Sequence, residues 1–531
     1  MSLKDLPMSL INFIFRKIRL LKYHIFIYFP LFFYFGSRSY IAQDEGYYAL
    51  QSRWILDSGN WLAPMWWSEP VFDRTIGLQW LIASCQSILG NSIFVSHLPS
   101  LISGIIALIV TYKISQNLLG QEFSWISPFA LSMSFLWINN LHLATQDMPL
   151  LALELVGIYS FLKSSLSKAN VWLFLSGAWI GLAFMLKTFM VLLPLLSIAP
   201  YLYFYSRRVF RSKYFYLGFM IGFLPFIIWL LLSINLYGFS EVSLLYTKVQ
   251  DLSSTDLYSK SPLYYLWNTP LKTFPWSILA LIGSIFSFKH FSLKTNMIAL
   301  YYPLILLTLL SIFNTKTPYY ALQITPYIAL QSTVALKYLF ETRSNIVVFL
   351  SWIVSCLGLT FIIFSLLNFK YKFLSLASSG DLNIASALLL LLGSFWALSI
   401  FAKSEKTFFG VFITGLYLSF VLLVQSGILS DRVPNFRIAH TNIVLPKELG
   451  EQEVYFVFPK DKLTSHSFSQ VVRLALPTKR LGHRLNDPKL LNKGQYAWIE
   501  NSRIPELHSK TYKVITQSPI FRPWSLIYLL N

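Results

Sequence analysis

Carboxylates and cations stand at the edges of apolar runs in a chain that is otherwise poor in charge. Charged residues make up 12% of the 531 positions, yet Asp44 and Glu45 are adjacent, shortly after the first apolar run. Further charges at such edges are Asp73, Arg74, Asp147, Lys187 and Lys316. A carboxylate can take a proton from a hydroxyl, and Lys or Arg can bind an anionic group such as a phosphate. The sequence therefore offers candidates for a general base and for an anion clamp.

The composition places these charges in a membrane protein. The chain is 55% hydrophobic and 17% aromatic, with a mean hydropathy of +0.55, which lies outside the range of soluble globular proteins. A net charge of +20 would suggest nucleic acid in a soluble protein, but much of the Lys and Arg lies in short segments between apolar runs. The two cysteines, Cys85 and Cys356, do not suggest a disulfide framework. We therefore expect an all-α polytopic membrane protein with no nucleic-acid partner.

The apolar runs predict about thirteen transmembrane helices. They lie near residues 23–36, 97–114, 122–141, 149–162, 170–186, 188–205, 214–236, 273–288, 297–313, 318–336, 345–367, 383–401 and 407–426. Several runs are shorter than the ~20 residues that a straight span needs, so their boundaries are approximate. The transmembrane region is expected over residues 23–426.

The distribution of Lys and Arg predicts the orientation. One set of connectors is short and basic, as in Arg207 and Arg208, whereas the opposite set is long and mixed or, at 142–148, nearly free of cations. Because cytoplasmic loops are enriched in Lys and Arg, residues 1–22 are expected in the cytoplasm. With an odd number of spans, residues 427–531 are then extracytoplasmic. The charges described above all fall on the outer face, which favours a site at the boundary of lipid and water.

The first outer loop, residues 37–96, is predicted to carry two interfacial helices. Residues 46–58 have an amphipathic helical pattern that Gly59 stops, and residues 75–89 form an apolar stretch that Gly90 stops. Neither needs to cross the membrane. This loop is therefore expected to form a platform along the outer surface.

The segment 427–531 is predicted to be a separate small domain. It is polar and rich in proline, and residues 453–458 and 495–499 have the composition of strands. About a hundred residues are enough for a small domain of the α/β type.

Several short motifs in collinear order resemble one family of membrane enzymes. They are DEGYY at 44–48, DSGNW at 57–61, EPVFDR at 69–74, FVSHLPS at 94–100, QDMPL at 146–150, GLAFMLK at 181–187 and KTPYY at 316–320. Together these segments resemble the bacterial aminoarabinose transferase and protein O-mannosyltransferase-like superfamily. Its members are integral-membrane glycosyltransferases of the GT-C fold. The resemblance covers about residues 20–335.

The resemblance implies transfer of a sugar from a polyprenyl-phosphate donor to an acceptor at the outer face of a bacterial-type inner membrane, with inversion at the anomeric carbon. Asp44 is then expected to be the general base, with Asp147 and Asp73 as further catalytic carboxylates. The residues expected to bind the donor phosphate are Arg74, Lys187, Lys316, Tyr319 and Tyr320. Glu45 and Tyr48 are expected to support the site.

Structural alternatives exist for these residues. Asp44 or Glu45 would also suit the N-terminus of the helix that begins near residue 46, and Asp147 would suit the start of the next span. Interface lysines that reach toward water, and aromatic residues of the interfacial belt, are common in membrane proteins. This structural alternative applies to the lysines and tyrosines of the candidate site, which are Lys187, Lys316, Tyr319 and Tyr320.

The chain departs from the family pattern at three places. Arg74-Thr75-Ile76 stands where many relatives have Lys or His followed by two prolines, and His97 stands where the pattern usually has Arg. The second long outer loop, around 258–265, lacks the His that relatives often carry near a metal site. A divalent cation, held by Asp73 with Asp44 or Asp147, is therefore left open, and no metal ligands are assigned.

Competing functions differ in the acceptor or in the class of protein. The leading hypothesis is transfer to a lipid or to a surface glycan, with membrane lipids around the site. A protein O-glycosyltransferase would use the same donor class with a protein hydroxyl as acceptor. A flippase or transporter of lipid-linked sugars is the alternative from another class. The lack of an internal repeat in the sequence and the long interfacial first loop count against it.

Overall fold

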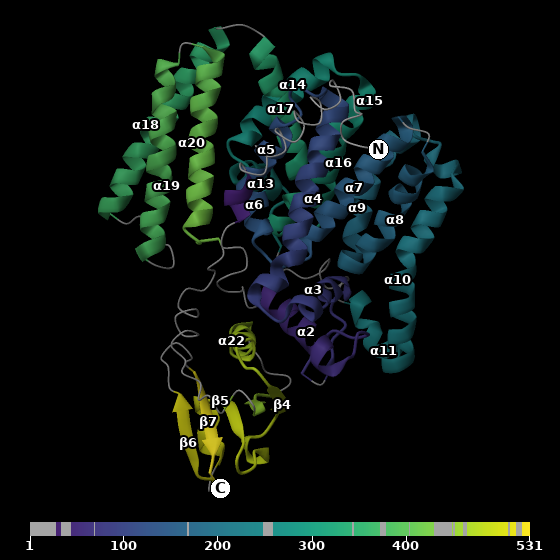
Figure 1. Cartoon of the computed structure of the whole chain (residues 1–531), viewed down its shortest axis with the longest axis vertical. Helices are drawn as coiled ribbons and strands as arrows, with labels where there is room; N and C mark the ends of the chain where they lie inside the picture. Colours follow the sequence, from purple (N-terminus) through teal and green to yellow (C-terminus); the bar gives the residue numbers. More distant parts are fainter. Residues whose placement is uncertain are drawn as a thin grey trace, which may run out of the picture.

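The computed structural model describes residues 28–32, 44–67, 69–166, 169–247, 259–341, 345–371, 379–402, 404–429, 449, 452–459, 465–507, 510–516 and 523–530. Most of these residues are helical, and a small sheet lies at the C-terminal end of the molecule (Figure 1). The predicted cytoplasmic segment, residues 1–22, lies outside the described residues.

The loop that was predicted to be the first outer loop folds as two helices joined by a short hairpin. Helix α2 runs from Glu45 to Ser58, and α3 runs from Gly77 to Leu89. Gly59 ends α2 with φ 68°, a left-handed conformation that glycine adopts without steric cost. Between the helices, β1 (Met65–Trp66) pairs antiparallel with β2 (Glu69–Pro70). The two helices predicted in this loop are therefore confirmed.

Eight helices in the described part of the chain are long and apolar enough to cross a membrane. They are Ile93–Leu119 (α4), Asp147–Leu166 (α7), Asn170–Lys187 (α8), Lys213–Tyr237 (α10), Leu293–Ile312, Val348–Tyr371, Asn383–Phe401 and Glu405–Gln425 (α20). The fifth comprises α15 (Leu293–Asn296), the π-helical η6 (Met297–Tyr301) and α16 (Tyr302–Ile312). The next two lie within α18 (Asn345–Tyr371) and within α19 (Ser379–Ala397) with η8 (Leu398–Phe401). A ninth candidate is the pair α13 (Tyr264–Lys272) and α14 (Trp276–His290), bent by 110°.

Several of the remaining predicted spans fold as shorter or broken helices. The run 122–141 divides into α5 (Ile126–Ser132) and α6 (Phe135–Leu141). The run 188–205 becomes η3 (Thr188–Val191) and the 14-residue α9 (Leu192–Tyr205). The run 318–336 begins with the 3-10 helix η7 (Pro318–Ile324) before α17 (Thr325–Glu341). Every residue of α5 is buried, so its apolar character reflects packing inside the protein rather than contact with lipid.

Glycines bring α8 and α10 into close contact. Gly177 and Gly181 on α8, and Gly218 and Gly222 on α10, share a four-residue spacing that places each pair on one helix face. A Cβ atom on Gly181 would lie 2.1 Å from the backbone nitrogen of Phe223. Since no side chain larger than hydrogen fits there, the two backbones pack directly. This contact fixes α8, which ends at Lys187.

The C-terminal segment forms a five-stranded mixed sheet in the order β4-β3-β5-β7-β6. Strand β3 is parallel to β4 and to β5, whereas β7 is antiparallel to β5 and to β6. The bounds are β3 Val454–Val457, α22 Ser465–Ala475, β4 Leu481–Leu485, β5 Tyr496–Glu500, β6 Tyr512–Thr516 and β7 Trp524–Leu529. Short helical turns elsewhere are η2 (Phe29–Phe32), η4 (Val209–Arg211), α11 (Phe239–Val242), η10 (Pro488–Leu490) and η11 (Asn501–Leu507). The predicted α/β character of this region is confirmed.

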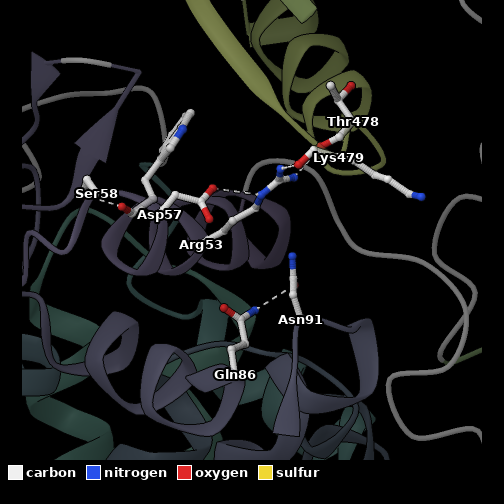
Figure 2. Close-up of polar contacts among 8 residues, drawn as sticks. Arg53, Asp57, Ser58, Gln86, Asn91, Thr478 and Lys479 are labelled. Carbon is white, nitrogen blue, oxygen red and sulfur yellow. Dashed lines mark hydrogen bonds and ion pairs between the residues drawn. The ribbon is translucent and has the colours of Figure 1, made fainter. Parts of the chain in front are cut away.

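The C-terminal sheet packs against α2. The guanidinium of Arg53 donates hydrogen bonds to the carbonyl oxygens of Thr478 (2.5 Å) and Lys479 (Figure 2). Trp54 and Trp67 share one buried apolar cluster with residues of β3, β5 and β7. This contact ties the C-terminal domain to the helix that follows Asp44.

Polar and aromatic contacts extend the same interface. Arg484 in β4 forms an ion pair of 3.0 Å with Glu69, so Glu69 contributes to the contact with the C-terminal domain. The rings of Trp66 and Phe468 stack with centroids 4.7 Å apart. The hairpin of the first loop is thus also held by the C-terminal domain.

Candidate active site

Two helix ends and one 3-10 helix bring Asp147, Lys187 and two tyrosines together. Asp147 is the first residue of α7, and Lys187 is the last residue of α8. Lys187 Nζ donates to Asp147 Oδ1 at 2.6 Å. The same nitrogen lies 5.0 Å from the ring centroid of Tyr319 and 4.9 Å from that of Tyr320, both in η7. The lysine is therefore held by one carboxylate and two aromatic rings.

Arg74 forms a second paired group in the loop before α3. Its Nε and Nη2 atoms donate to Asp73 Oδ2 at 3.1 and 2.9 Å, and its Nη1 donates to the phenol oxygen of Tyr48 at 2.6 Å. The guanidinium carbon also lies 5.3 Å from the ring centroid of Tyr47. Burial raises the pKa of Tyr48 to about 12, although the charge of Arg74 acts in the opposite direction. The Tyr48 hydroxyl therefore keeps its proton near neutral pH.

Asp44 lies within the electrostatic reach of both groups. Its side chain makes no capping hydrogen bond to α2, although it occupies the N-cap position. Burial raises the pKa of the Asp44 carboxyl group, Arg74 and Lys187 lower it, and Asp147 and Glu45 raise it further. The net direction is upward, because desolvation is the largest effect. Asp44 is thus a more basic carboxylate than an ordinary Asp.

The paired groups remain accessible to a ligand. The Lys187 and Asp147 side chains keep 18% and 12% of their surface exposed, and Arg74 and Asp73 keep 26% and 23%. An ammonium has three N–H donors and a guanidinium has five. The bond to Asp147 uses one donor of Lys187, and the three bonds of Arg74 leave two of its donors for a ligand. An anionic group can therefore be bound without breaking either ion pair.

Lys316, the third cation expected to bind the donor phosphate, is held by a backbone carbonyl group. It lies in the loop between α16 and η7, where its Nζ atom donates to the carbonyl oxygen of Phe313. The residue is 2% exposed, and burial lowers the pKa of its ammonium group. The neighbouring Thr317 accepts a hydrogen bond of 3.0 Å from the Tyr265 hydroxyl at its carbonyl oxygen. Lys316 is therefore more enclosed than Lys187.

Glu45 has contacts that the sequence did not predict. Its Oε1 atom lies 2.9 Å from His97 Nε2 and accepts a hydrogen bond of 2.8 Å from the backbone N–H of Ala144. The departure from the family pattern at His97 was visible in the sequence, but its partner was not. Glu45 is 1% exposed, so it is closed to solvent, whereas the Lys187 side chain keeps 18% of its surface exposed.

The carboxylates do not gather into a metal-ligand set in the part of the chain that the structure describes. There, no group of three or more His, Cys, Asp and Glu side chains is placed to hold an ion. Asp44, Asp73 and Asp147 are the residues considered for a cation, and Asp73 and Asp147 are each already paired with a basic side chain. The described residues, as arranged, do not fit a divalent cation.

Part of the chain is similar in sequence to known sugar transferases. A family model described as dolichyl-phosphate-mannose-protein mannosyltransferase matches residues 73–231. The undecaprenyl phosphate-alpha-4-amino-4-deoxy-L-arabinose arabinosyl transferase 2 of Pseudomonas fluorescens is 30% identical over 171 residues, which are 31% of this chain and 29% of that protein. The corresponding enzyme of Proteus mirabilis is 28% identical over 180 residues, or 32% of each chain. The alignments thus span about a third of the length of these relatives.

The fold is similar over almost the whole chain. The crystal structure of ArnT from Cupriavidus metallidurans bound to undecaprenyl phosphate matches with a TM-score of 0.73 and 14% identity, covering 96% of this chain and 97% of that one. The apo structure of the same protein matches with a TM-score of 0.68 and 15% identity, covering 96% and 98%. The predicted GT-C fold and the resemblance to the aminoarabinose transferase and protein O-mannosyltransferase-like superfamily are confirmed.

Proposed function

We propose that this chain is an inverting glycosyltransferase that moves a sugar from a polyprenyl-phosphate carrier to a lipid or surface-glycan acceptor. The observation that carries the proposal is the convergence of Asp44, the Lys187–Asp147 pair and the Arg74–Asp73 pair. A basic carboxylate beside two accessible cations combines the groups needed to deprotonate a hydroxyl and to stabilise a departing phosphate. The sequence relatives and the fold neighbours support the same donor class.

In the proposed reaction, Asp44 takes the proton of the acceptor hydroxyl. The hydroxyl oxygen then forms a bond with the anomeric carbon of the sugar, while the bond from that carbon to the phosphate oxygen breaks. The phosphate leaves with the bonding electron pair and gains negative charge. Attack from the face opposite the leaving phosphate inverts the anomeric configuration. The raised pKa of Asp44 increases its strength as a base.

The cations are proposed to bind the donor phosphate before and during this step. Lys187 and Arg74 have free donors and exposed surface, so both can contact phosphate oxygens. Asp147 and Asp73 are proposed to orient these two cations. Tyr319 and Tyr320 would shape the pocket around Lys187. Lys316 would contribute its positive charge from an enclosed position, because it is 2% exposed and its Nζ atom donates to the Phe313 carbonyl oxygen.

The proposed orientation places the site outside the cell. In it, residues 1–22 are cytoplasmic, residues 23–426 form the catalytic membrane region of a bacterial-type inner membrane, and residues 427–531 form an extracytoplasmic domain. The packing of the C-terminal sheet on α2 supports a location of both on the same side. A protein hydroxyl as acceptor remains the alternative within the same donor class.

The proposal predicts transfer from one or more members of a panel of tagged undecaprenyl-phosphate sugars. Membranes that contain the native chain are incubated with each donor, and labelled lipid, glycan and protein fractions are separated. We expect a labelled lipid or glycan that membranes lacking the chain do not produce. Label in protein alone would favour the protein O-glycosyltransferase. Donor that crosses the membrane without becoming attached to any acceptor would favour the transporter and contradict the proposal.

A further inference from the structure

The buried side chain of Glu45, next to Asp44 in the chain, connects three segments of the protein. It is the first residue of α2, and its Oε1 atom contacts His97 Nε2 of α4 and the backbone N–H of Ala144. Ala144 lies in the loop that leads to Asp147. The Glu45 and His97 side chains are 1% and 2% exposed, which excludes direct contact with a substrate.

Hydrogen bonds at both ring nitrogens hold the His97 side chain in one orientation. His97 Nδ1 lies 2.7 Å from the carbonyl oxygen of Ile93, and a carbonyl can only accept, so Nδ1 carries a hydrogen. His97 Nε2 faces the same carboxylate oxygen that accepts the Ala144 N–H. Both ring nitrogens of His97 therefore have a buried partner, the Ile93 carbonyl oxygen at Nδ1 and the Glu45 carboxyl group at Nε2. Removing either side chain breaks this buried contact and its hydrogen bond.

A second contact from the same face of α4 holds the loop before α7. The Ser100 hydroxyl donates to the carbonyl oxygen of Leu143 at 2.6 Å, and Ser100 follows His97 by one helical turn. The start of α2 and the loop 142–146 are therefore both fixed to α4. Asp44 directly precedes Glu45, and Asp147 follows Ala144 by three residues. The Glu45 contacts thus connect the backbone that carries Asp44 with the backbone that carries Asp147.

We propose that Glu45 and His97 are positioning residues that set the placement of Asp44 relative to the Asp147–Lys187 pair. This inference rests on the proposed function, because the proposed function makes Asp44 the general base whose placement is at issue. Without the pair, the start of α2 and the loop before α7 lose their shared anchor. Asp44 then shifts relative to the donor phosphate held by Lys187, while the phosphate contacts themselves remain. A displacement of about 1 Å can cost on the order of 10²-fold in rate.

The test compares Glu45→Ala, His97→Ala and the double variant with the native chain, using a donor that the native chain accepts. We expect kcat to fall by about 10- to 100-fold in each single variant, with the KM for the donor changed by less than about 3-fold. The double variant should fall no further than the slower single variant, because both remove the same anchor. Glu45→Gln keeps an oxygen that can accept the Ala144 N–H, so it should restore part of kcat even if the alanine variants fold poorly.

Asn296→Ala serves as a matched control for lost stability. Asn296 is buried and bonds to Ser287, between α14 and α15, so its loss weakens packing without touching the start of α2. Its kcat should stay within about 3-fold of the native value at equal folded protein. Native kcat in the Glu45 and His97 variants, independent losses that multiply in the double variant, or a change confined to KM would each overturn the inference. Lack of transfer by the native chain would instead contradict the proposed function.

Discussion

Replacing Asp44 with Asn is expected to lower kcat by about 10²–10⁴-fold, the usual contribution of a general base. Asn matches Asp in size but cannot take the acceptor proton. The Asp44 side chain makes no capping hydrogen bond, so α2 should remain intact. The measurement is the steady-state rate of sugar transfer by purified native chain and Asp44→Asn, normalised to the amount of folded protein.

The pH dependence of kcat/KM in the same two proteins identifies the base. A general base works when deprotonated, so kcat/KM rises as pH passes through its pKa. Because burial raises the pKa of Asp44, the rise in the native chain should lie above the range of an ordinary Asp. The rise should be absent from the residual activity of Asp44→Asn. Equal rates in the two proteins, or an unchanged pH profile, would remove Asp44 from the mechanism.

Replacing Lys187 with Gln is expected to lower kcat/KM for the donor by about 10²–10³-fold, the cost of removing one charge-stabilising donor from a transition state. The change removes a cation near the departing phosphate and leaves Asp147 without its partner. The measurement is the rate of transfer as a function of donor concentration.

Lys163→Gln is a matched control for the loss of a lysine. Lys163 lies near the far end of α7 from Asp147, and its Nζ atom contacts the ring of Tyr159 at 5.9 Å from the centroid. Its kcat/KM should remain within about 3-fold of the native value. Similar losses in the two variants would mean that Lys187 acts only through the stability of the fold.

The elements of the first loop were predictable from sequence because local chemistry defines them. Gly59 stops α2 with a positive φ, and the apolar stretch before Gly90 forms α3. These features depend on a few neighbouring residues. The α/β character of the C-terminal domain followed from the short runs of β-branched and aromatic residues that form β3 and β5, for the same reason.

The points at which the predicted spans break were less predictable, because hydropathy does not show where an apolar helix is interrupted. The sequence predicted one span over residues 122–141, whereas the structure has two short helices, α5 and α6, separated at Met133 and Ser134. Every residue of α5 is buried, so this helix needs an apolar sequence just as a membrane span does.

The partners within the candidate site depend on tertiary packing. Lys187 and Asp147 are 40 residues apart in sequence, and Glu45 and His97 are 52 apart. The motifs indicated which residues would lie near the outer face. The position of Lys187, however, depends on the glycine-mediated packing of α8 on α10, because Lys187 is the last residue of α8. The ion pair between Glu69 and Arg484 likewise forms only because the C-terminal domain packs against the first loop.

The most direct test of the proposed site is a single-turnover measurement of phosphate-carrier release. Purified chain in nanodiscs is loaded with the donor that it accepts, acceptor is added, and free undecaprenyl phosphate is quantified over time. We predict release in a 1:1 ratio with glycosylated acceptor, at a rate that falls in Asp44→Asn while the loaded donor is still bound. Release at the native rate in Asp44→Asn, or no release by the folded native chain with any donor, would contradict the proposed function.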